Sequence, residues 1–197
     1  MRARCPPSDS GSAVVASHSL DPVAHLRELS TAAARAADTL GPQISQAAKI
    51  VRDSIYADGT IFFCGNGGSA ADAQHMSTEY VVRYKKERRA LRSIALTTDT
   101  SLLTAAGNDF SFDDIFSRQI EALGRAGDVL MIHTTSGNSR NCIKAALAAK
   151  KLGVTTICLT ARDGCKIKPM VDLCIVVPVD RTDRPQELHR NITNTSS

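Results

Sequence analysis

The chain has 197 residues, of which 43% are hydrophobic and 22% are charged, a composition that is ordinary for one soluble globular domain. No apolar run approaches the roughly 18 residues that a membrane helix needs, so a membrane-spanning protein is excluded. Residues 1–20 contain no apolar stretch of signal-peptide length, and we expect them to form a disordered tail before a single domain over 21–197. We therefore expect a cytoplasmic protein with no membrane partner.

Charge, aromatic content and cysteine spacing argue against further classes. The net charge of +4 is small and aromatic residues make up 4% with no Trp, so no nucleic-acid partner is expected. The dense basic run at 85–89 is interpreted as a solvated loop or helix end. No two of the six cysteines are separated by two residues, which excludes a zinc-knuckle or redox CxxC motif.

The first elements in chain order are two predicted helices. Residues 22–38 and 42–57 carry apolar side chains near helical spacing, and Asp21 with Pro22 forms a plausible cap and first turn. The Gly41–Pro42 pair between them predicts a turn. Two antiparallel helices are therefore expected before the rest of the domain.

After Gly59, short apolar runs alternate with helical stretches, a pattern typical of strands that are buried on both faces. The predicted strands are 60–64, 93–96, 128–133, 154–159 and 173–177. The predicted helices are 69–84, 100–106, 112–123, 139–152 and 164–170. Repeated strand–helix units predict an α/β fold with a doubly wound, five-stranded parallel sheet. Ligands bind such sheets at the carboxyl ends of the strands, beside helix N-termini.

The first candidate site is the glycine-rich sequence CGNGGS at 64–69, directly after the first predicted strand. Its glycines permit positive φ and a close approach of the backbone to a ligand. Ser69 opens the next helix, whose free N–H groups and positive dipole end favour an anion. A tight turn capped by Ser69 would explain the same residues, so this loop alone does not decide between the two.

A second loop of related design reads HTTSGNS at 133–139 and follows the third predicted strand, directly before a helix. Four hydroxyls, a Gly and an Asn exceed what a capped turn requires. Hydroxyls and backbone amides hold a phosphate without a lysine, and neither loop has the GxxxxGK[ST] pattern of triphosphate sites. The two loops together predict a phosphate-binding site.

Three further groups of polar residues remain open to more than one interpretation. His75 and Glu79 lie four residues apart on one helix face, as a metal pair, an acid–base pair or a surface pair. Asp99, after the second predicted strand, either binds sugar hydroxyls or caps a helix. The polar start of a further helix near the C-terminus contains Asp183, Gln186, Glu187 and His189.

In combination these motifs resemble the phosphoheptose isomerases, the sedoheptulose 7-phosphate isomerase branch of the sugar-isomerase (SIS) domain superfamily. The resemblance covers about residues 22–189 and rests on CGNGGSAADAQH, ALTTDTSLLTAAGNDFSFDDIFSRQIEALGRAGDVL, TTSGNS and DRPQELH. It implies a flavodoxin-like SIS domain that converts sedoheptulose 7-phosphate to D-glycero-D-manno-heptose 7-phosphate through an enediol. It also implies a homotetramer with active sites at the subunit interfaces.

The resemblance implies roles for the residues that match the family's motifs. Glu79 matches the carboxylate that moves the proton between C1 and C2. In members that bind zinc, three of the four metal ligands match His75, Glu79 and Gln186. The positions that contact the phosphate or other parts of the substrate match Asn66, Gly67, Gly68, Ser69, Asp99, Thr134, Thr135, Ser136, Ser139, Asp183 and Gln186.

The sequence departs from the family near its end. Family members continue through a long apolar helix with a second His eight residues beyond the matched Gln, and Asn194 stands at that position here. We therefore expect a truncated or divergent C-terminal helix, and impaired activity because the family's acid and fourth zinc ligand are missing. The alternative function is a noncatalytic SIS module that binds a partner protein or senses a sugar phosphate. Asn194 favours this alternative, whereas Glu79 favours the enzyme.

Overall fold

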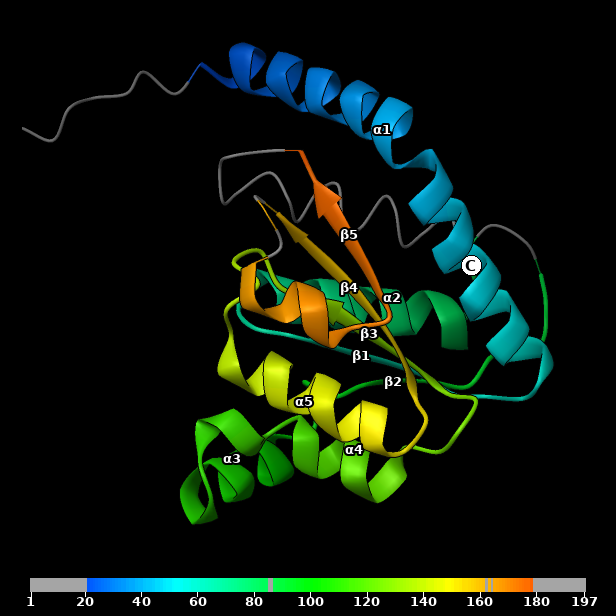
Figure 1. Ribbon diagram of the computed structural model, residues 1–197, viewed down its shortest axis with the longest axis vertical. Helices are drawn as coiled ribbons and strands as arrows, with labels where there is room; N and C mark the ends of the chain where they lie inside the picture. The colour runs from blue at the N-terminus through cyan, green and yellow to red at the C-terminus, as the bar shows by residue number, and fades with distance from the viewer. Residues whose placement is uncertain (1–20, 85–86, 162, 164, 179–197) are drawn as a thin grey trace, which may run out of the picture.

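The computed structural model describes residues 21–178 except 85–86, 162 and 164 (Figure 1). Its five strands are β1 (Ile61–Gly65), β2 (Ser93–Ala95), β3 (Val129–His133), β4 (Thr155–Ala161) and β5 (Leu173–Val177). All neighbouring pairs are parallel, and the order across the sheet is β2-β1-β3-β4-β5. This is the order of flavodoxin-like folds, so the predicted α/β class and doubly wound parallel sheet are confirmed.

Helices cover both faces of the sheet, as Figure 1 shows. They are α1 (Pro22–Tyr56), α2 (Gly68–Val81), α3 (Thr100–Asp109), α4 (Ser117–Leu123) and α5 (Arg140–Lys151). Alternate residues of each strand enter different cores because strand side chains alternate between faces. Ile61 and Phe63 of β1 join α1 and α2 in one core. Phe62 and Cys64 join α3, α4 and α5 in the other.

The prediction of two antiparallel N-terminal helices is wrong. Residues 22–56 form one helix, α1, which passes through Pro42, and Figure 1 shows that its axis bends part-way along. Pro removes one hydrogen bond and its ring crowds the preceding turn, which kinks a helix without ending it when packing holds both halves. Leu40 before the kink and Val51 after it are both buried. The predicted cap is confirmed, since Asp21 Oδ1 accepts a hydrogen bond from the Val23 N–H at 2.9 Å.

The remaining elements lie within a few residues of their predicted bounds, with two exceptions. The predicted helix 112–123 divides into a 3-10 turn (Phe112–Asp114) and α4, and the predicted helix 164–170 is a 3-10 turn (Cys165–Met170). Between the 3-10 turn and α4, the Ser117 hydroxyl donates a hydrogen bond to the Asp114 carbonyl at 3.3 Å. Such a side-chain bond gives the backbone an alternative to a continuous helix. Among the described residues, no helix is long and apolar enough to cross a membrane.

Several predictions concern residues that lie outside those described. They are the tail over 1–20, the divergent C-terminal helix, and the residues Asp183, Gln186, Glu187, His189 and Asn194.

Candidate active site

The two predicted phosphate loops begin side by side. β1 and β3 are neighbours in the sheet, and their register pairs Gly65 with His133, the last residue of each strand. The chain leaves β1 toward β2 on one side and leaves β3 toward β4 on the other. This is the topological switch point at which open parallel sheets bind ligands.

Gly65 allows the two loops to approach each other closely. A Cβ on Gly65 would lie 2.8 Å from the His133 carbonyl oxygen and 2.7 Å from that of Ser69, closer than side chains tolerate. Only a glycine therefore lets the start of α2 lie against the end of β3. The structure therefore places Ser69 beside His133, the residue that directly precedes the 134–139 loop.

The start of α2 has no side-chain cap. Its N-cap residue is Gly67, with φ of 56°, and no side chain accepts a hydrogen bond from the first turn. The alternative in which Ser69 caps the turn is therefore wrong. Ser69 is buried, and its hydroxyl makes no hydrogen bond to another described residue. An uncapped helix start beside an unused hydroxyl favours an anionic ligand.

The start of α5 is similar. Its N-cap residue, Ser139, makes no capping hydrogen bond, and its hydroxyl lies 3.5 Å from that of Thr134. Thr134 is buried and Thr135 is half-buried. The exposed Ser136 differs, because its hydroxyl accepts the Asn138 N–H at 3.2 Å within the loop. Hydroxyls of the second loop therefore line the same edge of the sheet as the start of α2.

An amide pair joins the two loops. Asn66 Nδ2 donates to Asn141 Oδ1 at 2.9 Å, and Asn141 Nδ2 donates to Asn66 Oδ1 at 2.8 Å. Asn66 was predicted as a substrate contact, whereas Asn141 was not singled out. No sequence signal identifies Asn141, because Asn is common near helix starts for capping alone.

Asp99 caps a helix in the structure. Its Oδ1 accepts a hydrogen bond from the Leu102 N–H at 2.9 Å in the first turn of α3. Its carboxylate is exposed at the carboxyl end of β2, on the same edge of the sheet as the two loops. The capping interpretation is confirmed, and the predicted contact with sugar hydroxyls stays a prediction.

His75 and Glu79 form a pair on α2, with His75 Nε2 3.4 Å from Glu79 Oε1. The Glu79 side chain is only 17% exposed, against 46% for His75, so Glu79 is more enclosed than a simple surface pair requires. Two ligands bound tetrahedrally at about 2.0–2.1 Å from one zinc ion lie roughly 3.3–3.4 Å apart, so the pair fits as part of a zinc site. The described residues contain no group of three such donors, and Gln186 lies outside them.

Arg88 holds the end of α2 that carries Glu79. Its guanidinium donates to the main-chain carbonyls of Glu79 at 2.7 Å and Tyr80 at 2.9 Å. Basic side chains near a helix C-terminus satisfy carbonyls that have no helical partner. The interpretation of the basic run as solvated is therefore wrong for Arg88, which is half-buried.

Comparison with known proteins identifies the family. The SIS domain family profile matches residues 24–161. A phosphoheptose isomerase of Akkermansia muciniphila is 48% identical over 155 residues, covering 79% of this chain and 82% of the relative. The solved phosphoheptose isomerase GmhA of Neisseria gonorrhoeae superposes with a TM-score of 0.83 at 45% identity, covering 89% of this chain and 94% of that one. The phosphoheptose isomerase structure of Francisella tularensis gives 0.86 at 35% identity, covering 90% and 95%.

The chain belongs to the phosphoheptose isomerase family of SIS-domain proteins. The predicted family and fold are therefore confirmed.

In this phosphoheptose isomerase family member, the core beneath the candidate site holds two ionisable groups whose pKa values are raised. A hydrogen bond with Cys142 and burial both raise the pKa of the Cys64 thiol well above its usual value. Burial raises the pKa of Tyr80, whose ring packs 5.6 Å from that of Phe63. The described cysteines with placed side chains are free thiols.

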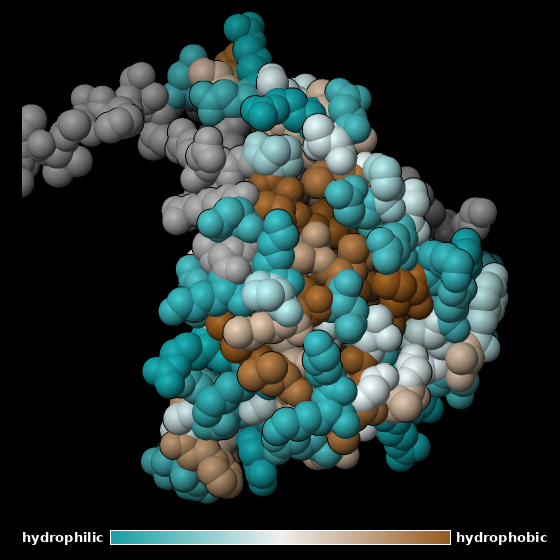
Figure 2. All heavy atoms as spheres, viewed as in Figure 1, coloured by the Kyte–Doolittle hydropathy of each residue, from teal (hydrophilic) through white to brown (hydrophobic). Residues whose placement is uncertain are grey.

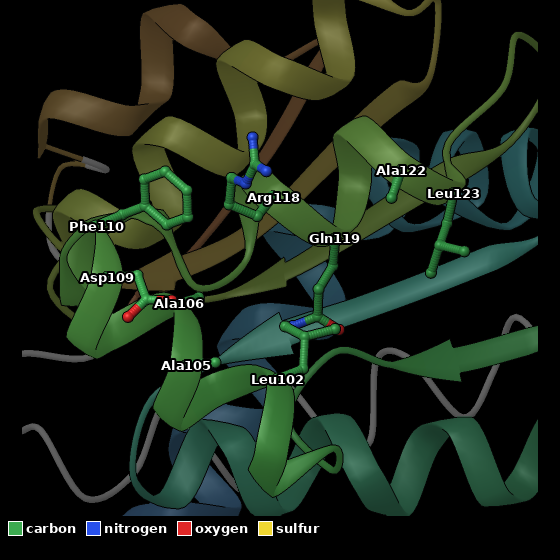
Figure 3. A pocket seen from close by; sticks show the side chains of 9 residues that line it. All are labelled: Leu102, Ala105, Ala106, Asp109, Phe110, Arg118, Gln119, Ala122 and Leu123. Carbon is green, nitrogen blue, oxygen red and sulfur yellow. The ribbon is translucent and has the colours of Figure 1, made fainter.

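A separate pocket of about 320 Å³ lies between α3 and α4 (Figure 3). Its lining is mostly apolar and consists of Leu102, Ala105, Ala106, Asp109, Phe110, Arg118, Gln119, Ala122 and Leu123. The Arg118 guanidinium lies 4.7 Å from the centre of the Phe110 ring, as a cation–π pair. None of the residues of the two phosphate loops lines this pocket, so it is distinct from the candidate active site.

Proposed function

We propose that this chain is an aldose–ketose isomerase that converts sedoheptulose 7-phosphate to D-glycero-D-manno-heptose 7-phosphate. The observation that carries the proposal is the meeting of two uncapped helix starts, α2 and α5, at the switch point of the sheet. Its relatives at about half identity over most of the chain are named phosphoheptose isomerases. The names of these relatives supply the substrate class, and the loops supply a reason for its phosphate.

The phosphate group would be held by neutral donors. The backbone N–H groups of Gly67 and Gly68 have no partner among the described residues, and those of Arg140 and Asn141 have none either. The proposal adds the hydroxyls of Ser69, Thr134, Thr135, Ser136 and Ser139 as further donors to the phosphate. Helix starts and hydroxyls together stabilise a dianion without a lysine. Asp183 and Gln186 remain proposed substrate contacts on the family resemblance.

The proton transfer would be performed by Glu79. Aldose–ketose exchange needs a base that takes a proton from the carbon beside a carbonyl and returns it to the neighbouring carbon of an enediol. Glu79 is enclosed, lies against His75, and has its backbone held by Arg88. His75 would orient the carboxylate, while the phosphate loops fix the distant end of the sugar.

We include zinc in the proposal as a cofactor held by His75, Glu79 and Gln186. Imidazole nitrogen and carboxylate oxygen are donors that zinc prefers, and the 3.4 Å between them fits one ion. When bound, zinc would polarise the substrate carbonyl and stabilise the enediol oxygens.

We also propose a cytoplasmic homotetramer with its active sites at subunit interfaces. Three large apolar side chains, Val81, Val82 and Tyr84, are exposed directly after Glu79, at the end of α2. Figure 2 shows a further band of apolar residues on the face between α1 and α5. Exposed apolar surface of this kind favours contacts between protein chains. The alternative of a noncatalytic SIS module is not favoured, because the relatives at 48% and 54% identity are named as isomerases.

The proposal is tested by mixing the purified protein with sedoheptulose 7-phosphate, with and without zinc, and following aldose formation. Glu79→Gln should lower turnover by roughly a thousandfold, because it removes the base while keeping the size of the side chain. Its Kd for inorganic phosphate should stay within about twofold of the wild-type value, since Glu79 lies outside both loops.

The matched control is Glu121→Gln on α4, which makes the same chemical change at an exposed position and should leave turnover unchanged. Equal turnover in wild type and Glu79→Gln would remove Glu79 from the mechanism. Phosphate binding without any aldose formation by the wild type would instead support the noncatalytic SIS module.

A further inference from the structure

The Asn66–Asn141 pair is a reciprocal side-chain hydrogen-bonded connection between the two candidate phosphate loops. Asn66 follows β1, and Asn141 is the second residue of α5, after the loop that follows β3. Each side-chain amide donates to the carbonyl oxygen of the other, at 2.9 and 2.8 Å. Cys142 of α5 adds two thiol contacts to the first loop, a 3.9 Å approach of Asn66 Nδ2 to its Sγ and a hydrogen bond with Cys64. Beyond the strand pairing of β1 with β3, the two loops share no backbone hydrogen bond in the described part of the chain.

The geometry of the pair is restrictive. Two amides that each donate and accept must lie nearly coplanar and face each other, so both bonds form at only one separation and orientation. Asn141 is 2% exposed, and its Oδ1 also accepts the Cys142 N–H at 2.9 Å. This third bond fixes the Asn141 amide to the first turn of α5. Asn66 is in turn fixed to the end of β1.

We propose that Asn141 is a positioning residue that, through Asn66, sets the spacing of the two phosphate-binding loops. Sheet pairing fixes Gly65 against His133, but it ends there, and the donors that would contact phosphate lie beyond it. The amide pair fixes the distance between the chain segments beyond the strands, where α2 and α5 begin. This inference rests on the proposed function for the identity of the ligand, since a dianion bound from two loops gains most from a preset spacing.

The inference is tested with Asn141→Ala, using inorganic phosphate as the probe in calorimetry and sedoheptulose 7-phosphate in the activity assay. The Kd for phosphate and the KM should rise roughly tenfold, while kcat changes by less than about twofold, because α2 and Glu79 stay packed on the sheet. Phosphate binding is measured without turnover, so a failure of the isomerase proposal leaves this test intact.

The structural control is Thr156→Val. Thr156 is fully buried at the opposite end of the sheet, where its hydroxyl donates to Asp172 Oδ2 at 2.7 Å and accepts the Asp172 N–H at 3.0 Å. Loss of this hydroxyl in Thr156→Val should lower the melting temperature about as much as Asn141→Ala does, and it should leave the phosphate Kd unchanged. If both variants lose stability and neither changes the Kd, the amide pair is only structural and the inference is wrong.

A double variant tests whether the two amides act as one unit. In the Asn66→Ala background, Asn141→Ala should not raise the phosphate Kd further, because the connection is already broken. Additive effects would contradict the inference.

If Asn141→Ala does not fold, Asn141→Asp keeps the size and one acceptor but removes the donor. It is compared with Asn138→Asp, which adds the same charge to an exposed position of the same loop. A larger rise in Kd for Asn141→Asp supports the positioning role, and equal rises would refute it.

Discussion

The helices α2, α3 and α5 all begin at the same end of the sheet, but only the start of α3 has its backbone N–H groups capped by the N-cap side chain. Asp99 caps α3 with its own carboxylate, at 2.9 Å from the Leu102 nitrogen. The N-cap residues of α2 and α5, Gly67 and Ser139, make no such bond. All three helices follow a parallel strand, so the sheet alone does not produce this difference.

The α3 start is capped by a side chain of the protein itself, whereas the starts of α2 and α5 are not capped by their N-cap residues. A capped start has its donors satisfied and already carries a negative charge, which repels a second anion. An uncapped start costs stability unless water or a ligand accepts its N–H groups. The two uncapped starts are those that Gly65 and the Asn66–Asn141 pair bring together. This arrangement favours one shared ligand over two separate turns.

The largest effect on stability is expected from Gly65→Ala, which would force the two uncapped starts apart. The new Cβ would lie 2.8 Å from the His133 oxygen and 2.7 Å from the Ser69 oxygen, both backbone atoms that cannot rotate away. We expect the free energy of unfolding to fall by about 3 kcal/mol and the phosphate Kd to rise more than tenfold. Thermal melting and calorimetry measure the two effects.

Gly107→Ala in α3 is the matched control for this change. A Cβ there meets nothing within 4 Å, so this variant should be neutral or stabilising by up to about 1 kcal/mol. An unchanged melting temperature for Gly65→Ala would show that the loops tolerate a wider separation.

A capping carboxylate at the start of α5, like the one at the start of α3, should stabilise the fold but weaken phosphate binding. Ser139 has the extended backbone of an N-cap residue, so Ser139→Asp can accept a first-turn N–H as Asp99 does. We expect the free energy of unfolding to rise by about 0.5 kcal/mol while the phosphate Kd rises roughly a hundredfold through charge repulsion. Ser30→Asp, at an exposed position of α1, adds the same charge as a control. Unchanged phosphate binding by Ser139→Asp would place the ligand elsewhere.

The sequence predicted the sheet and the two loops because both leave local signals. Buried strands such as β3 and β5 are short apolar runs, and clusters of Gly, Ser and Thr before a helix are visible without any tertiary information. The course of α1 was not predictable in this way, because tertiary packing of both halves outweighs the local effect of Pro42. Neither Asn141 nor Arg88 could be identified, since each is defined by a partner that only the fold brings near.

A smaller effect is expected when one unused hydroxyl is removed from the start of α2. The Ser69 side chain is buried without a hydrogen bond to another described residue, so Ser69→Ala should leave the free energy of unfolding unchanged or slightly higher. The phosphate Kd should rise about tenfold in calorimetry, because the lost donor serves only the ligand.

Ser77→Ala is the converse change on the same helix. Ser77 is buried and accepts a hydrogen bond from the Ser93 hydroxyl at 3.1 Å. The free energy of unfolding of the Ser77→Ala variant should fall by about 1 kcal/mol, and its phosphate Kd should stay at the wild-type value. If Ser69→Ala instead destabilises the fold and leaves the Kd unchanged, the hydroxyl is a structural group.

The smallest effect is expected at the capped start. Asp99→Ala should cost about 1 kcal/mol of unfolding free energy and leave the Kd for inorganic phosphate unchanged, since the carboxylate serves its own helix. Asp21→Ala, which removes the cap of α1, should cost about the same. Asp99→Asn separates the two interpretations of this residue, because Asn caps helices as well as Asp does and carries no charge. A KM for the sugar phosphate that rises in Asp99→Asn, with the melting temperature retained, would show that the carboxylate also binds the sugar. A change in inorganic phosphate affinity would contradict the distinction between capped and uncapped starts.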